Sequence, residues 1–217
     1  MKHFYLLVPL ALAVGCHLCS FNNDKPTRAP VVTNAEGTTT RTPNSVHADT
    51  KARSVAISLS PANMNIAFTG STALMSQTGH FERYEGTLEV PTGDPKDLKI
   101  RVAIDMDSTT TKIGLLTKHL KAEDFFDVAR FPKAEFVLDS VEPTGDAGQF
   151  QVFGKLSLRG VARPVAFPAR IRITSEQVSF DATINVLQTE FGMTEAARKT
   201  KDEVPVTVSI HAMRKSS

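Results

Sequence analysis

The sequence predicts an all-β fold, an antiparallel domain of about eight strands that follows an export signal and a flexible linker. Apolar and polar residues alternate in short runs from Ser54 almost to the C-terminus, which is typical of strands with one buried face and one wet face. Turns that contain Gly and Pro separate these runs. No strand–helix–strand repeat is visible, so a parallel sheet is not expected. Many short strands in one domain indicate either a sandwich or a closed barrel.

The N-terminus predicts a secretory signal peptide of the lipoprotein type over residues 1–15. A short basic start precedes an apolar run from Phe4 to Gly15, which is shorter than the ~20 residues that span a bilayer. The run ends in Leu-Ala-Val-Gly-Cys, which resembles the bacterial lipobox, and Cys16 is therefore the expected site of lipid attachment. The alternative is ordinary cleavage after Ala13, which would leave Cys16 and Cys19 free or paired.

Residues 16–53 are expected to form a flexible tether between the membrane anchor and the folded domain. This stretch is rich in Thr, Asn, Pro and Ala and has no apolar period of either kind. Such a composition cannot bury enough apolar surface to offset the entropy lost on folding. The alternative is that this stretch is an unfolded remnant with no function. The folded domain is assigned to residues 54–217, which contain no Cys. Its stability must therefore come from its core, and thiol catalysis is excluded there.

The expected strands follow from the two-residue period of their apolar side chains. Six runs are regular and three are shorter, and Gly- and Pro-containing turns lie between several of them. In chain order they are Val55 to Leu59, Asn65 to Thr69, Tyr84 to Val90, Leu98 to Met106, Ala134 to Ser140, Phe150 to Leu158, Val165 to Ile173, Val178 to Val186 and Val204 to Ile210.

One segment between two of these strands departs from the two-residue period. From Thr109 to Arg130 the apolar residues mix three- and four-residue spacings, so Lys118 to Asp127 predicts one or two short helical pieces. We expect them to cover a barrel mouth or a sheet edge.

A sandwich and a barrel differ in what the apolar face encloses. A sandwich fills its core with side chains, whereas a barrel of about eight strands can hold one ligand. Gly154, Ala169 and Ala182 interrupt inward rows of Val, Phe and Ile. Small inward residues leave space, which favours a barrel with a cavity.

The composition excludes several classes of function. The formal net charge of +2 gives no electrostatic footprint for nucleic acid. The six His are scattered, with no Cys or carboxylate at the spacing of metal ligands, so no metal site is expected. The sequence has neither a nucleophile motif nor a glycine-rich phosphate loop. We therefore expect no cofactor and no enzymatic activity.

A few polar residues leave two interpretations open. His119 would either meet a ligand headgroup at the mouth or bond to backbone at a helix end. Asp124 and Asp127 flank Phe125 and Phe126, where capping is a more ordinary role for a carboxylate than acid–base chemistry. The two Phe are expected to plug the barrel end.

Four arginines raise the same choice. They would either form a basic rim for a pyrophosphate or lie on a solvated face, which is the more ordinary arrangement. They are Arg159, Arg163, Arg170 and Arg172.

Six sequence blocks resemble, in the right order, those of one bacterial family, the YceI-like proteins. The resemblance covers roughly Val55 to Met213, the whole predicted domain. The blocks are Phe68-Thr69-Gly70-Ser71, Gly79-His80-Phe81, His119 to Val128, Phe131 to Phe136, Gly154 to Val165 and Phe191-Gly192-Met193. The chain departs from the common pattern at Leu116-Thr117, where many members have Arg-Asp, and at Gln188, where many have Arg. Both departures concern polar contacts at the cavity entrance and hence headgroup preference.

The resemblance implies an extended, lipocalin-like antiparallel β-barrel whose lumen holds an amphiphile with a long apolar tail, such as a polyisoprenoid or quinone. Burial of such a tail is favourable in proportion to its area, by about 25 cal/mol per Å². The residues expected to line the lumen or its mouth are Ile100, Val102, Ile104, His119, Phe125, Phe126, Phe136, Val152, Leu156, Phe167, Phe180 and Ile184.

Two functions from different classes follow. The first is a binding protein that sequesters or shuttles a long-tailed lipid in the bacterial periplasm or envelope. The second is a structural or protein-interaction module whose barrel is filled by its own side chains. The leader predicts an exported protein, either lipid-anchored or soluble. His17 stands where Asp commonly marks inner-membrane retention, which favours the outer membrane.

Overall fold

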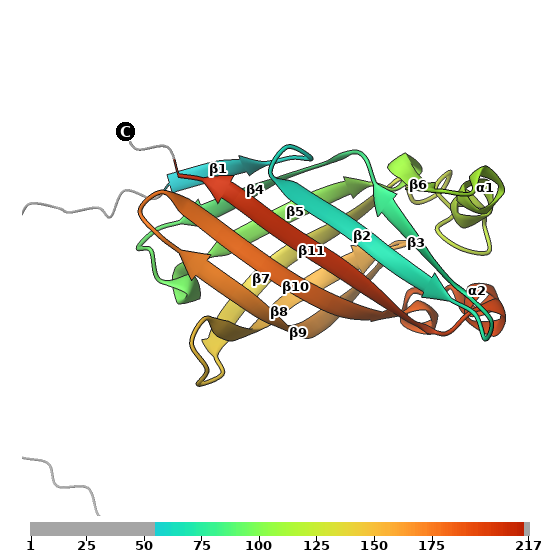
Figure 1. Ribbon diagram of the computed structural model, residues 1–217. Coiled ribbons are helices and arrows are strands. Elements are labelled where there is room, and N and C mark those ends of the chain that lie inside the picture. The colour runs from blue at the N-terminus through green and yellow to red at the C-terminus, as the bar shows by residue number, and fades with distance from the viewer. Residues whose placement is uncertain (1–54, 215–217) are drawn as a thin grey trace, which may run out of the picture. The chain divides into compact units, whose positions relative to one another are not determined.

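The computed structural model describes residues 55–214, which form one antiparallel β-sheet curled into a barrel (Figure 1). The predicted all-β antiparallel barrel is confirmed. The signal peptide, Cys16 and the tether all lie outside the described residues, so these expectations stay predictions. No helix within residues 55–214 is long and apolar enough to cross a membrane.

The sheet has eleven strands, so the prediction of about eight was wrong. Its order is β1-β4-β5-β7-β8-β9-β10-β11-β2-β3-β6, and every neighbouring pair is antiparallel. The strands are β1 (Val55–Leu59), β2 (Met64–Ser71), β3 (Ser76–Phe81), β4 (Tyr84–Val90), β5 (Lys99–Asp105), β6 (Thr109–Thr111), β7 (Lys133–Pro143), β8 (Gln149–Leu158), β9 (Val161–Ile173), β10 (Gln177–Leu187) and β11 (Glu203–Met213).

The helical elements are short. The α-helices α1 (Gly114–Lys121) and α2 (Thr194–Lys199) lie at one end of the barrel (Figure 1). Three 3₁₀ turns are η1 (Pro95–Asp97), η2 (Met106–Ser108) and η3 (Gln188–Phe191). The helical piece expected over Lys118 to Asp127 exists as α1, which begins four residues earlier and ends at Lys121.

The two strands that the sequence did not predict lack an apolar alternation. β6 consists of three Thr residues, and β3 has a single large apolar residue, Phe81. Both are held by pairing with neighbours, since β3 lies between β2 and β6 in the sheet order. Tertiary context therefore decides their conformation, and a pattern search misses them.

The sheet order begins at β1 and ends at β6 with no ladder between these edge strands, which leaves a seam in the barrel wall. Side chains and loops bridge it. The Tyr84 hydroxyl donates to the Met64 carbonyl at 2.5 Å, which joins β4 to β2. Nearby, the backbone N–H of Arg83 donates to the Ser108 hydroxyl at 3.0 Å. These bonds satisfy polar groups that a closed ladder would otherwise pair.

The two ends of the barrel interior are filled differently. The end remote from the helices is packed solid by apolar side chains that are at most 5% exposed: Leu59, Leu88, Val90, Leu98, Val141, Val152 and Val178. A β-bulge between Leu138 and Ser140 helps to fill it, because the extra residue resets the alternation so that Val141 turns inward opposite Val152. The hollow end lies on the side of α1 and α2.

Gly154 does not create the cavity, contrary to the expectation from small inward residues. A Cβ at Gly154 would lie 2.7 Å from the Phe136 ring and 2.7 Å from the Val137 carbonyl oxygen, so the ring already occupies the space above this glycine. Neither Ala169 nor Ala182 lines the cavity. The open volume comes instead from the length of the barrel beyond its packed end.

The close approach at Gly154 predicts a loss of stability in Gly154→Ala. The added methyl group must displace either the Phe136 ring or backbone, which should lower the free energy of unfolding by about 2 kcal/mol. The matched control is Gly70→Ala on β2, where no atom lies within 4 Å of the new methyl group. Urea denaturation of both variants measures the difference. Equal midpoints would show that Phe136 moves aside without cost.

Candidate ligand cavity

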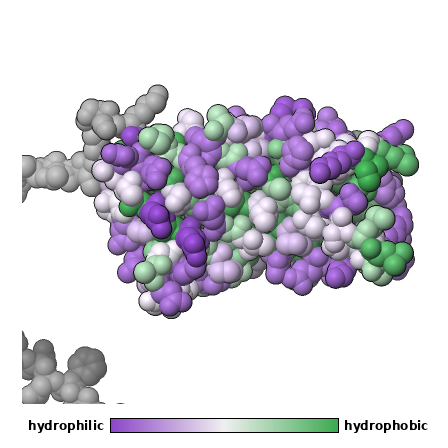
Figure 2. Space-filling view, in the orientation of Figure 1, coloured by the Kyte–Doolittle hydropathy of each residue, from purple (hydrophilic) through white to green (hydrophobic). Residues whose placement is uncertain are grey.

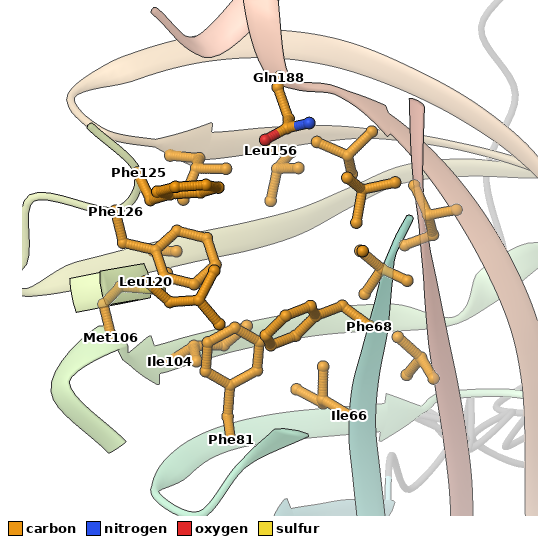
Figure 3. A pocket seen from close by; sticks show the side chains of 18 of the residues that line it. Ile66, Phe68, Phe81, Ile104, Met106, Leu120, Phe125, Phe126, Leu156 and Gln188 are labelled. Carbon is orange, nitrogen blue, oxygen red and sulfur yellow. The ribbon is translucent and has the colours of Figure 1, made fainter. Parts of the chain in front are cut away.

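The hollow end encloses an apolar cavity of about 400 Å³ (Figure 3). This volume lies within the range of ~300–1,000 Å³ that small-molecule sites occupy. Alternation directs every second side chain of each strand inward. The strands β2, β5, β10 and β11 supply Met64, Ile66, Phe68, Ile100, Val102, Ile104, Phe180, Ile184, Val186, Val204, Val206, Val208 and Ile210.

Polar side chains line only the end of the cavity that is near the helices. They are Thr72, Gln77, Thr111, Gln188 and Thr200, and none of the described residues that line the cavity carries a charge. The cavity reaches the surface there, because its wall includes exposed Thr72, Met75 and Ile113. We call this opening the mouth. Its chemistry suits an uncharged polar group above an apolar chain.

Gln188 is the most buried of these polar residues, with 5% of its surface exposed. Its Nε2 amide donates to the Thr200 hydroxyl at 2.9 Å and to the Lys201 carbonyl at 2.7 Å. These two bonds use the donors of the amide, and in Figure 3 the amide oxygen points towards the interior. Within residues 55–214 no donor is bonded to that oxygen, which leaves an acceptor at the cavity wall.

Four phenylalanines narrow the cavity below the mouth. The Phe68 and Phe81 ring centroids are 5.4 Å apart, and Phe126 meets Phe68 edge-on at 5.8 Å. Phe125 and Phe126 follow α1 and point inward from the loop (Figure 3). Phe125 also packs against the ring of His119 at 5.0 Å. The loop thus covers the lumen, as the helical segment was expected to do.

Ten of the twelve residues that the sequence proposed for the lumen or mouth line this cavity. They are Ile100, Val102, Ile104, Phe125, Phe126, Phe136, Leu156, Phe167, Phe180 and Ile184. Val152 does not, because it lies in the packed end, where it is paired with Val141. His119 does not either, because it lies exposed on α1 and only packs on Phe125. Whether the ten contact a ligand stays a prediction.

Sequence reasoning missed several wall residues that the same alternation contained. Ile66 and Phe68 lie in an expected strand, and so do Val206 and Val208. Their rows indicated burial but not which end of the barrel is hollow. Gln188 carried a further signal, since it departs from the family pattern at a residue that the structure places in the wall.

The carboxylates beside the Phe pair are structural. Asp127 is buried and has a positive φ of 49°. Its Oδ2 lies 3.3 Å from Nη1 of Arg130 and 4.0 Å from Nη2 of Arg159. Asp124 accepts a hydrogen bond from the Lys199 ammonium at 2.6 Å, which lowers the pKa of Asp124. This pair joins the loop to α2. Neither carboxylate lines the cavity, and neither caps a described helix, so the capping interpretation was wrong.

The four arginines do not form a rim around a ligand site. Arg159 donates to the Gly192 carbonyl at 3.1 Å, and Arg163 donates to the Glu190 carbonyl at 3.4 Å. Arg170 and Arg172 lie on the outer face of β9. Arg170 and Arg172 therefore lie on a solvated face, whereas Arg159 and Arg163 fasten η3 to the β8–β9 hairpin.

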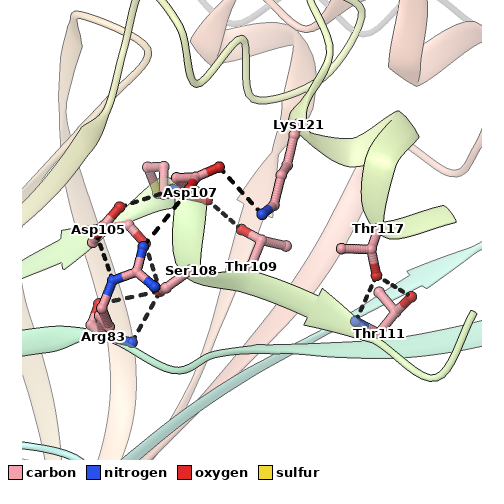
Figure 4. Close-up of polar contacts among 9 residues, drawn as sticks. Arg83, Asp105, Asp107, Ser108, Thr109, Thr111, Thr117 and Lys121 are labelled. Carbon is pink, nitrogen blue, oxygen red and sulfur yellow. Dashed lines mark hydrogen bonds and ion pairs between the residues drawn. The ribbon is translucent and has the colours of Figure 1, made fainter. Parts of the chain in front are cut away.

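A polar network anchors the segment that leads into α1 (Figure 4). Asp105 accepts from Arg83 Nε at 2.8 Å, and Lys121 lies 3.2 Å from Asp107. Burial acts to raise the pKa of Asp105, but the bonds from Arg83 and the Asp107 backbone, with the charges of Arg83 and Lys121, outweigh it and lower the pKa. The Thr117 hydroxyl accepts the Thr111 N–H at 2.9 Å. α1 is thus fixed beside the mouth.

Residues 55–214 contain no group of three His, Cys, Asp or Glu side chains that is placed to hold a metal ion. The binding chemistry of the cavity therefore comes from its apolar walls and from the amide oxygen of Gln188.

Comparison with known proteins places this geometry in a family. The model of the YceI-like domain matches residues 57–212. Protein YceI of Salmonella arizonae is 28% identical over 142 residues, which cover 63% of this chain and 73% of that protein.

Solved structures at low sequence identity share the fold. BcnA of Burkholderia cenocepacia has a TM-score of 0.63 at 20% identity, covering 69% of this chain and 96% of that one. A polyisoprenoid binding domain from Saccharophagus degradans, implicated in plant cell wall breakdown, has a TM-score of 0.58 at 13% identity, covering 74% and 99%. At such identities the likeness shows the fold alone.

Proposed function

The chain belongs to the YceI-like family, and on this premise we propose that it binds a long-tailed, uncharged amphiphile such as a polyisoprenoid or a quinone. The observation that carries the proposal is the apolar cavity with a polar mouth and no charged wall residue within residues 55–214. A structural neighbour of the same fold is named a polyisoprenoid binding domain, which supports this class of ligand.

The volume of the cavity sets the length of chain that it shelters. By proportion with a cavity of ~150 Å³ that binds benzene, about 400 Å³ accommodates roughly sixteen carbon atoms. At about 0.8 kcal/mol per buried methylene, burial of these carbon atoms stabilises the ligand by roughly 13 kcal/mol relative to water. The alternative location of such a lipid is a bilayer, where it is equally dry. Because the lipid gains little free energy on moving from the bilayer into the cavity, the protein suits transfer and sequestration of the lipid.

The alternative of a side-chain-filled interaction module is less well supported, because only one end of the lumen is packed. Binding needs no catalytic group, and we propose that the chain is not an enzyme. Arg159 and Asp124, which lie outside the cavity wall, are engaged in structural bonds.

Mass spectrometry of the protein purified from a bacterial host tests the proposal. Native spectra should show a mass increment that corresponds to one lipid, and organic extraction should release a neutral, long-tailed compound. A protein that is recovered without lipid, and that fails to take up farnesol in solution, would refute lipid binding.

We propose further that the chain works in the periplasm or envelope, anchored through an acyl group on Cys16. The apolar leader and the lipobox-like sequence support this location. Labelling with a radioactive fatty acid should mark the wild type and leave Cys16→Ser unlabelled. Equal labelling of the two would place the acyl group elsewhere.

The acceptor at Gln188 predicts selectivity for a ligand with a hydroxyl or other donor. In Gln188→Leu the affinity for farnesol should fall about fivefold, which corresponds to one hydrogen bond of ~1 kcal/mol. The affinity for farnesene, the corresponding hydrocarbon, should stay the same or rise. Equilibrium binding of the two probes measures both. An equal loss for both would mean that Gln188 only shapes the wall.

A further inference from the structure

Two exposed apolar patches flank the mouth of the cavity. Leu74 is 94% exposed and Met75 59% exposed in the β2–β3 turn, while Ile113 and Leu115 are 46% and 79% exposed at the start of α1. We call these four residues the apolar rim. Figure 2 shows hydrophobic surface at this end of the barrel, in two patches among hydrophilic residues. Such exposure of large apolar side chains is costly unless something covers them.

The rim is continuous with the cavity wall. Met75 and Ile113 belong both to the exposed rim and to the lining of the cavity. The antiparallel pairing of β3 with β6 brings the two patches to the same end, because β3 begins just after Met75 and β6 ends just before Ile113, with Gly79 opposite Thr111. An apolar ligand that leaves the cavity therefore passes directly between the two patches.

Charge around the rim matches an anionic surface. Residues 109–122 contain Lys112, Lys118 and Lys121 and no acidic residue. Lys112 and Lys118 are exposed, and within the described part of the chain neither forms an ion pair. At the opposite end the stretch around the β7–β8 turn is acidic, since residues 139–149 contain three acidic residues and no Lys or Arg, but Arg170 of β9 lies beside it, opposite Gln149. Lysines near an anionic bilayer are attracted to it.

We propose that the apolar rim docks the mouth onto an anionic phospholipid bilayer, so that the ligand moves between bilayer and cavity without crossing water. This inference rests on the proposed lipid binding and names the partner of the same site. An amphiphile that crosses water would expose its whole tail, whereas a mouth seated among acyl chains keeps the tail covered. The exposed Lys112 and Lys118 beside the rim orient this end towards an anionic membrane.

The absence of Trp from the sequence provides a direct test. Leu74→Trp and Leu115→Trp each place a single reporter on the rim. Met213→Trp places the control at the exposed end of β11, which lies at the end of the barrel remote from α1 and α2 (Figure 1). The full-length chains carry Cys16→Ser so that an acyl group cannot tether them. With vesicles of phosphatidylcholine and phosphatidylglycerol, emission from the two rim reporters should shift to the blue and be quenched by lipids brominated on their tails. The control should not respond.

A second measurement links docking to transfer. The double variant Leu74→Asp, Leu115→Asp should bind these vesicles at least about tenfold more weakly and remove fluorescent prenyl alcohol from them about tenfold more slowly. Its affinity for farnesol in solution should stay unchanged. Met213→Asp is the matched control and should behave as the wild type in all three assays.

The outcomes separate the two proposals. A chain that binds farnesol, but whose rim reporters stay in water on vesicles, would overturn docking and leave lipid binding intact. Reporters that shift only with protein concentration, without vesicles, would also overturn it in favour of a second copy. Rim insertion without any lipid uptake would uphold docking and refute lipid binding.

Discussion

Replacing Val206 by Trp should abolish most lipid binding without unfolding the barrel. Val206 is an inward residue of β11, paired with Phe68 on β2 and Ile184 on β10, and all three line the cavity. The indole would displace roughly three methylene groups of a bound chain, each worth about 0.8 kcal/mol. The dissociation constant of farnesol should therefore rise about fiftyfold.

The next residue along the strand provides the control for this prediction. Thr207 is exposed on the outer face of β11, so Thr207→Trp adds the same ring without touching the lumen. Equilibrium binding measures affinity, and thermal unfolding checks that both variants stay folded. Equal affinity of the two variants would mean that the ligand lies elsewhere and would remove the main support for the proposed function.

The sequence predicts the wall of the barrel better than it predicts the two ends. Alternation alone identified Val102, Phe180 and Ile184 as inward residues, because a two-residue period fixes the face of a strand regardless of its partners. The two-residue period of apolar side chains does not indicate how far along the barrel a residue lies. Val152 was therefore assigned to the lumen although it sits in the packed end.

The mouth was the least predictable part, because it is built from segments without a period. Gln188 and Thr200 come from a 3₁₀ turn and a helix end, and they meet through a side-chain hydrogen bond that no local pattern encodes. The β2–β3 turn with Leu74 and Met75 lies outside every strand that the sequence predicts. Its importance appears only when the fold places it beside Ile113 at the cavity opening.

Removal of the Asp127 carboxylate should cause the largest loss of stability among the predicted substitutions. The Asp127 and Arg159 side chains are only 7% and 12% exposed, and Asp127→Ala leaves the guanidinium without its carboxylate partner. Breaking a buried pair on one side costs ~3–5 kcal/mol, so about 3 kcal/mol is expected for a pair separated by 4.0 Å. The positive φ of 49° adds to this loss, because Ala tolerates the left-handed region less well than Asp.

Two comparisons isolate the cause of that loss. Asp127→Asn keeps a side chain that tolerates the backbone angle and should recover part of the stability. Glu195→Ala removes a carboxylate only 2.7 Å from Arg198, but both side chains are more than half exposed, so less than about 0.5 kcal/mol should be lost. Chemical denaturation measures all three variants. A similar loss in Asp127→Ala and Glu195→Ala would show that burial does not strengthen the pair. Asp127 ends the loop that carries Phe125 and Phe126. We therefore expect Asp127→Ala to weaken farnesol binding as well. A folded Asp127→Ala variant with unchanged farnesol affinity would show that this loop holds its shape through its aromatic contacts alone.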